Sequence, residues 1–125
     1  MPDLDTQRAA IASALSGISG LRVDAEGLWP DRALVPVACI RPADANVPLN
    51  LTLTEWFEAY EVVVVTSVAG GLQRGQRALD DFYDLVVPAC VSIAAVLNVT
   101  RQAYGVIEVD GVECTGFVLR LEMIG

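Results

Sequence analysis

The chain has 125 residues, of which 54% are hydrophobic and 6% aromatic, so it is long enough for one domain whose core consists mostly of Ala, Val, Leu and Ile. Eight basic and sixteen acidic residues give a net charge of −8. This balance argues against binding to nucleic acids or anionic membranes, because both attract clustered Lys and Arg. The sequence contains no histidine, which excludes acyl transfer through an imidazole. We therefore do not expect an enzyme.

Neither a signal peptide nor a membrane span is expected. The first ten residues, MPDLDTQRAA, carry acids where a signal peptide needs positive charge. The longest uncharged run, 85–100, contains Pro88 and is shorter than the roughly 20 residues that cross a bilayer. Three widely spaced cysteines without a CxxC pair do not form a zinc motif. We expect Cys39, Cys90 and Cys114 to be reduced and mostly buried, in a protein assembled in a cytoplasm.

The first third of the chain predicts one helix and two strands. An amphipathic helix is expected over 3–20, where four apolar residues recur at helical spacing: Leu4, Ile11, Leu15 and Ile18. Short strands are expected over 21–24 and 33–41. Pro36 in the second strand indicates an edge position or a bulge, because proline cannot donate to a sheet ladder.

The stretch from 42 to 54, PADANVPLNLTLT, has two interpretations. It contains two prolines and two asparagines, as loops often do, and then alternates leucines with polar residues. In the first interpretation it is a loop that leads into the next strand. In the second it is an extended arm whose leucine face binds a partner outside the domain, through Asn46, Val47, Leu49 and Leu51.

The following part predicts a central strand and a long helix. Residues 55–68 are apolar on both faces over Val62–Val65, which is typical of a strand covered on both sides. A helix is expected over 72–88 and should end at Pro88. Five of its residues are expected to face inward: Leu72, Leu79, Phe82, Tyr83 and Val86. A short second helical piece is expected over 89–98.

The segment YGVIEVDGVECTGFVLRLEMI, from Tyr104 to Ile124, predicts a β-hairpin. Asp110 and Gly111 favour a two-residue turn, because both positions need positive φ. After the turn, apolar residues alternate along the strand and share one face: Phe117, Leu119, Leu121 and Met123. The elements together predict an α+β fold, a single domain over 1–125 with a mixed or antiparallel sheet flanked by helices and ending in a β-hairpin.

Gly70 and Gly75 have the spacing of a phosphate-binding loop between a strand and a helix. Such a loop also needs Lys followed by Ser or Thr, which hold the phosphate and magnesium. Gln76 and Arg77 occupy those positions. A plain strand-to-helix connection is therefore expected, without a nucleotide.

Three acids lie close together on the second predicted helix. Asp80 and Asp84 are four residues apart and share a face, with Asp81 beside them. Paired carboxylates can hold a cation or act as acid and base. No further ligands occur at a recognisable spacing, so no metal or catalytic site is expected, and a solvated helix face is the favoured interpretation.

Four segments carry a resemblance to a known family: the helix end ALSGISGLRV, the strand WFEAYEVVVVTSV, the helix RGQRALDDFYDLV and the closing ribbon YGVIEVDGVECTGFVLRLEM. They resemble the tail-terminator proteins of long-tailed bacteriophages, in the versions found in phages of actinobacteria. The likeness covers nearly the whole chain, from about Asp3 to Met123, and the glycine-containing ribbon is its most specific part. The segment after Pro42 does not match residue by residue.

The resemblance implies a small α+β subunit of the phage neck, six copies of which form a ring. The ring caps the finished tail tube and presents a surface to the head connector. Such proteins are not enzymes and need no cofactor. The implied partners are further copies of the chain, the tail tube protein and the head–tail connector protein, in the virion. The arm residues given above, together with Asp110 and Gly111, would then contact a ring neighbour or the tube.

A ring of six copies would carry six times −8, or −48 charges. Acids that line its channel would repel phosphates, so that DNA passes through without specific binding. Asp80, Asp81 and Asp84 are the candidates for this lining, with ordinary solubility as the alternative explanation. Two other functions stay open: a neighbouring neck component, such as a head-completion or connector protein, and a small metabolic or regulatory α+β domain.

Overall fold

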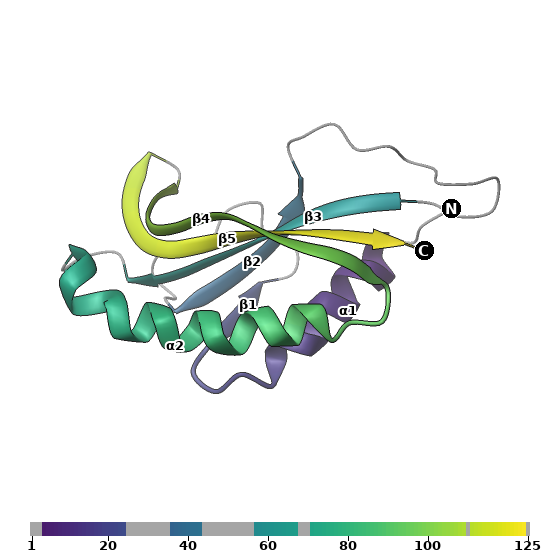
Figure 1. Ribbon diagram of the computed structural model, residues 1–125, viewed down its shortest axis with the longest axis horizontal. Helices are drawn as coiled ribbons and strands as arrows, with labels where there is room; N and C mark the ends of the chain where they lie inside the picture. Colours follow the sequence, from purple (N-terminus) through teal and green to yellow (C-terminus); the bar gives the residue numbers. More distant parts are fainter. Residues whose placement is uncertain (1–3, 25–35, 44–56, 68–70, 110, 125) are drawn as a thin grey trace.

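The computed structural model describes residues 4–24, 36–43, 57–67, 71–109 and 111–124. They form two helices and five strands: α1 (Leu4–Ser16), β1 (Arg22–Asp24), β2 (Val37–Pro42), β3 (Phe57–Ser67), α2 (Gly71–Val91), β4 (Val96–Val109) and β5 (Val112–Ile124). The strands make one sheet in the order β1-β2-β3-β5-β4, with β1 parallel to β2 and all other neighbours antiparallel. The expected α+β class, mixed sheet and closing hairpin are confirmed (Figure 1).

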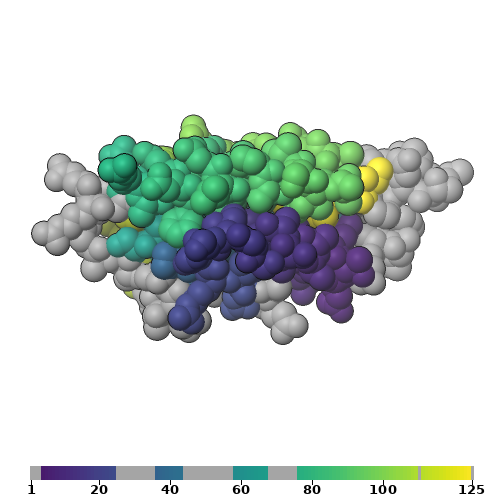
Figure 2. Space-filling model, turned by 90° about the horizontal axis from the view of Figure 1, so that it is seen from below, coloured from purple at the N-terminus to yellow at the C-terminus, as the bar shows by residue number. Residues whose placement is uncertain are grey.

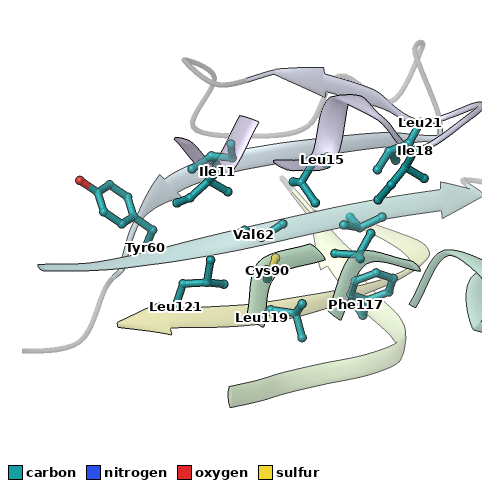
Figure 3. Packing of buried hydrophobic residues seen from close by; sticks show 14 of the residues in the cluster. Ile11, Leu15, Ile18, Leu21, Tyr60, Val62, Cys90, Phe117, Leu119 and Leu121 are labelled. Atoms are coloured by element: carbon teal, nitrogen blue, oxygen red, sulfur yellow. The ribbon is translucent and has the colours of Figure 1, made fainter. Parts of the chain in front are cut away.

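Both helices lie side by side on one face of the sheet (Figures 1 and 2). The main core fills the space between helices and sheet, where Ile11 and Leu15 of α1 and Val86 of α2 are fully buried. β5 contributes the four residues expected from its alternation: Phe117, Leu119, Leu121 and Met123. In Figure 3 the labelled residues of this core, among them Ile11, Leu15, Leu119 and Leu121, lie between the helices and the sheet. Burial of each large apolar side chain stabilises the fold by roughly 1.5–3 kcal/mol.

β3 is the central strand of the sheet, as its sequence predicts. It pairs with β2 on one side and with β5 on the other. Its four consecutive valines are all buried, with Val62 and Val64 in the main core and Val63 and Val65 on the opposite face. Neighbouring residues of a strand point to opposite faces. An uninterrupted apolar run therefore places apolar side chains on both faces, as a strand that is covered on both sides requires.

A second apolar cluster lies on the face of the sheet opposite the helices. It joins Val63 and Val65 of β3 to residues near the turn of the closing hairpin, Ile107, Val109 and Cys114. These strands can meet because the turn end of the β4–β5 hairpin curls over on the side away from the helices (Figure 1). The curl therefore closes an apolar surface that a flat hairpin would leave in contact with water.

Two glycines face each other in the curled part of the hairpin, where Gly105 of β4 pairs with Gly116 of β5. Gly105 has φ 109°, a conformation that side chains rarely adopt. A Cβ placed on Gly116 would overlap the backbone carbonyl oxygen of Val64 on β3. The close approach of β5 to β3 at this level therefore requires glycine.

Two sequence predictions about the first half need correction. Leu4 was expected to face inward, but it is 42% exposed, and Gln7 is the residue of this turn that lies inside. Its side-chain oxygen accepts a hydrogen bond of 2.7 Å from the buried hydroxyl of Tyr60, which ties α1 to β3. Pro36 does not mark an edge or a bulge, because it precedes β2, which lies between β1 and β3 with an unbroken register.

The boundary between the second helix and the hairpin was also wrong. α2 does not stop at Pro88 but continues to Val91, and the amide of Ser92 still donates to the Pro88 carbonyl at 3.0 Å. The proline leaves one helical hydrogen bond unmade, which the last turn tolerates. Of the helical piece expected over 89–98, only 89–91 are helical, as the end of α2, and β4 already begins at Val96.

We expect Gly116→Ala to destabilise the protein by about 1–3 kcal/mol or more, because the methyl group forces β5 away from β3. Gly17→Ala is the matched control, since a Cβ there meets nothing within 4 Å and should leave stability nearly unchanged. The free energy of unfolding, measured by denaturant titration, checks both variants. Equal stability of Gly116→Ala and the unmodified protein would contradict the close approach.

Candidate functional site

β4 forms one edge of the sheet, and within the described residues its only strand neighbour is β5. It is 14 residues long, whereas β1 at the opposite edge has 3. The outer side of an edge strand presents backbone N–H and C=O groups that can pair with another strand. Of the two edge strands in the described part of the fold, β4 therefore offers the longer row of backbone groups to a partner.

Exposed apolar side chains gather along this strand and the adjoining end of α2. Val91 is 60% exposed, Leu97 54%, Val106 57% and Tyr104 36%. We call the surface formed by these four residues, together with Val99 and Arg101, the β4 edge surface. Exposed apolar side chains along one strand edge suit contact with other molecules.

Arg101 is held in place by aromatic rings at the centre of this surface. Its guanidinium carbon lies 5.5 Å from the ring centroid of Tyr104 and 5.9 Å from that of Tyr83 on α2. Tyr83 in turn makes edge-to-face contacts with Tyr104 at 5.1 Å and with buried Phe117 at 5.2 Å. Cation–π contacts at exposed sites stabilise by roughly 0.5–1 kcal/mol each, so the arginine is oriented although its side chain is exposed.

Two bulges in β4 decide which residues share the helix-side face. Leu97 and Gln102 are extra residues in the pairing with β5, because the register shifts between Val96 and Asn98 and again between Arg101 and Ala103. The second bulge brings residues three apart, Arg101 and Tyr104, to the same face of the sheet. Without it, Tyr104 would point to the face opposite the helices.

An open pocket of about 240 Å³ lies at the start of β4. It is lined by five residues: Val91, Val96, Leu97, Asn98 and Val99. Sites for small molecules are usually deeper, enclose most of the ligand and place several polar groups around it. This pocket offers one amide side chain and four apolar ones, and it therefore suits a protruding apolar side chain of a protein partner better than a metabolite.

The predicted interface residues fall mostly outside the described part of the chain. Asn46, Val47, Leu49, Leu51 and Asp110 lie there, and their expected roles stay predictions. Gly111 lies at the exposed tip of the hairpin with φ 79°. Because Val109 pairs directly with Val112, the two-residue turn is confirmed.

The three acids lie on α2, as the sequence predicts. Asp81 and Asp84 are exposed and Asp80 is half-buried. Asp80 lies one turn before Tyr83 and thus on the flank of α2 that faces β4, whereas Asp81 points away from that flank. Within the described residues, no group of three or more His, Cys, Asp or Glu side chains is arranged to hold a metal ion.

All three cysteines are free thiols and buried, as expected. Burial raises the pKa of Cys90 to about 12. Burial also raises the pKa of Cys39 to about 11, with a further contribution from the negative charge of Asp24. A thiol reacts as its thiolate, so neither cysteine is a nucleophile in the folded protein.

The β4 edge surface was not predicted, because residues 89–98 were expected to be helical. The segment VLNVT, at 96–100, contains three β-branched residues in five, a composition that favours a strand. No comparable local signal indicates that β4 lies at an edge, since this depends on where β5 pairs. In the described part of the chain, no helix is long and apolar enough to cross a membrane.

No family model matches the chain, and a search of curated proteins finds no significant match. The function must therefore be inferred from the geometry of the fold and from the sequence patterns.

We expect Cys39 and Cys90 to resist thiol reagents in the folded protein near neutral pH and to react quickly once the protein is unfolded. Their raised folded pKa values stabilise the fold fully below the unfolded pKa of 9.0, and this contribution is lost as the pH rises from there to about 11 and 12. Labelling followed by mass spectrometry, with and without denaturant, measures this. Fast labelling of either cysteine in the folded protein would contradict the burial.

Proposed function

We propose that this chain is a structural protein of the bacteriophage neck. In this proposal six copies form a ring that caps the completed tail tube and joins it to the head connector in the virion. The observation that supports it best is the β4 edge surface, on a 14-residue strand that has a strand neighbour on one side only among the described residues and exposes Leu97, Tyr104 and Val106. Such a surface suits a protein that acts by binding other subunits.

The chemistry of the described residues supports binding over catalysis. The exposed groups that gather on the β4 edge surface are aliphatic and aromatic, with one arginine held against rings. Tyr and Arg are the residue types that contribute most often to the affinity of protein interfaces. Subunits that assemble through a strand edge need no reactive group, and the ring proteins that the sequence resembles need no cofactor.

The proposed partners are further copies of the chain, the tail tube protein and the connector protein. Assembly takes place in the host cytoplasm, and the product is part of the virion. DNA passes through the ring without specific binding, which fits a chain of net charge −8. Asp80 and Asp84, on α2, are the proposed channel-lining acids together with Asp81.

The proposal is tested by mixing the purified protein with purified tail tubes and examining the products by electron microscopy. We expect a ring of six subunits at one end of each tube. A ring that joins only the head side would identify the protein as a neighbouring neck component, and no binding to either structure would contradict a function in the neck.

Val106→Lys should abolish capping of tail tubes while leaving the fold intact. Val106 is 57% exposed, so the charge costs the isolated subunit little, whereas an interface must desolvate it. Leu85→Lys is the matched control, because Leu85 is 53% exposed on α2 but lies away from β4. Capping is counted in micrographs and the fold is checked by circular dichroism. Equal loss of capping in both variants would show that the β4 edge has no special role in capping.

Asp80→Lys combined with Asp84→Lys should slow DNA delivery from assembled virions, because lysines in the channel attract phosphate. Asp5→Lys is the control, since Asp5 is an exposed acid in the first turn of α1 and lies on neither α2 nor β4. Delivery is measured as the rate of DNA ejection from particles of each type. Unchanged ejection in the Asp80 and Asp84 variant would show that these acids do not line the channel.

A further inference from the structure

The helix-side face of β4 carries four side chains in an order that reads almost the same from either end. In chain order these are Val99, Arg101, Tyr104 and Val106. Their partners on β5 are Leu121, Leu119, Phe117 and Thr115, of which the first three belong to the core under the helices. All four β4 residues therefore point to the same side of the sheet. The outer positions are valines, and the inner pair is a cation and an aromatic ring.

This order is complementary to itself when two β4 strands run antiparallel. If residue 101 of one copy lies opposite residue 104 of the second, then Val99 lies opposite Val106. Residues directly opposite each other in an antiparallel pair point to the same face, and all four do so here. The bulge at Gln102 makes this possible, because it places residues three apart on one face of each strand. A strand without the bulge would turn one residue of each pair away.

We propose that the β4 edge of the free protein pairs with the β4 edge of a second copy. The two copies are related by a two-fold axis through the middle of the strand. The two five-stranded sheets then form one continuous ten-stranded sheet. A two-fold contact uses the same surface on both copies, which is what this order of side chains provides.

Charge and ring contacts favour the second copy as the occupant. Within the described residues no carboxylate forms an ion pair with Arg101, which has only ring partners in its own chain. In the pair of strands, each Arg101 lies beside its own Tyr104 and opposite the Tyr104 of the second copy. Cations and rings therefore alternate across the contact, and no two cations are direct neighbours. Cation–π contacts strengthen when they are desolvated.

The apolar part of the surface is buried by the same contact. Val99 and Val106 of the two copies pair directly, and aliphatic cross-strand pairs stabilise antiparallel sheets. The dimer thus covers backbone groups, the exposed Val106 and the half-buried Val99, and it prevents uncontrolled strand addition at this edge. It also blocks the β4 edge surface until another partner competes for it, so it regulates the same surface on which the proposed function depends. The dimer itself forms without any tail component and is tested without one.

The register is tested by disulfide trapping in the full chain. Val99→Cys combined with Val106→Cys places two thiols opposite each other in the dimer, whereas in one chain the two positions are seven residues apart along a strand and beyond disulfide reach. We expect oxidation to give a covalent dimer, seen by non-reducing electrophoresis and intact mass. Val99→Cys combined with Glu108→Cys is the control, since it shifts the pairing by two residues, and it should give at least tenfold less dimer.

The cation–ring contact is tested by exchange. Tyr104→Arg places two cations opposite each other and should shift the protein to monomer, measured by light scattering from micromolar to millimolar concentration. Adding Arg101→Tyr restores one cation and one ring at each position and should restore the dimer. Circular dichroism of each variant checks folding.

Two results would overturn the inference. One is a folded protein that stays monomeric at millimolar concentration and gives no Val99–Val106 cross-link. The other is equal trapping in both cysteine pairs, because this would show contact without the stated register. Either result leaves the capping of tail tubes to be judged by its own experiment, so failure of the dimer and failure of the neck function are distinguishable.

Discussion

The position of β5 between β3 and β4 is the constraint on which the rest of the structure depends. One side of this strand supplies Phe117, Leu119 and Leu121 to the core under the helices. Its backbone completes the ladders of both neighbours. At Gly116 it comes so near to β3 that no Cβ fits against the Val64 carbonyl. Loss of this strand would therefore separate β4 from β3 and remove several large side chains from the core under the helices.

The curl of the hairpin is the second consequence of the same pairing. Gly105 and Gly116 face each other without side chains, which leaves room for both strands to bend over the face away from the helices. Ile107 and Val109 then pack on Val63 of β3 and form the second apolar cluster. Among the described residues, apolar clusters thus lie on both faces of the sheet, although both helices lie on the same face. A fold with few aromatic residues reaches a well-buried core in this way.

Sequence reasoning identified the elements whose signals are local. The valine run of β3, the alternation of β5 and the turn between Val109 and Val112 each depend on a few adjacent residues, and all were placed correctly. The predicted helix end at Pro88 was wrong, because a proline in the last turn of a helix removes one hydrogen bond without ending the helical conformation. The start of β4 at Val96 was not predicted from the sequence, again because a local pattern was ambiguous. A short apolar run after a helix fits a further helical turn as well as a strand.

The candidate site was harder to predict than the fold, because it arises from topology. Whether β4 is an edge is decided by where β5 inserts, which is a contact between residues distant in sequence. The joint orientation of Arg101 and Tyr104 depends on a bulge, and one extra residue in a strand leaves no recognisable pattern in its sequence. The acids of α2, in contrast, follow helix geometry and were placed by spacing alone. Their function depends on what surrounds the helix in an assembly, which one chain does not specify.

An open edge of 14 residues exposes a protein to uncontrolled strand addition, and the described residues contain several features that limit it. Two bulges interrupt the ladder, and Arg101 sets a charge at its centre. Both devices are known to restrict pairing at sheet edges. They act by narrowing the set of acceptable partners, so only a strand with a matching order of side chains gains the full contact. Net charge works at longer range, because two copies of −8 repel each other until salt screens them beyond roughly 8 Å. Edge chemistry therefore selects the partner at contact distance, while the overall charge lowers the rate of all encounters between copies.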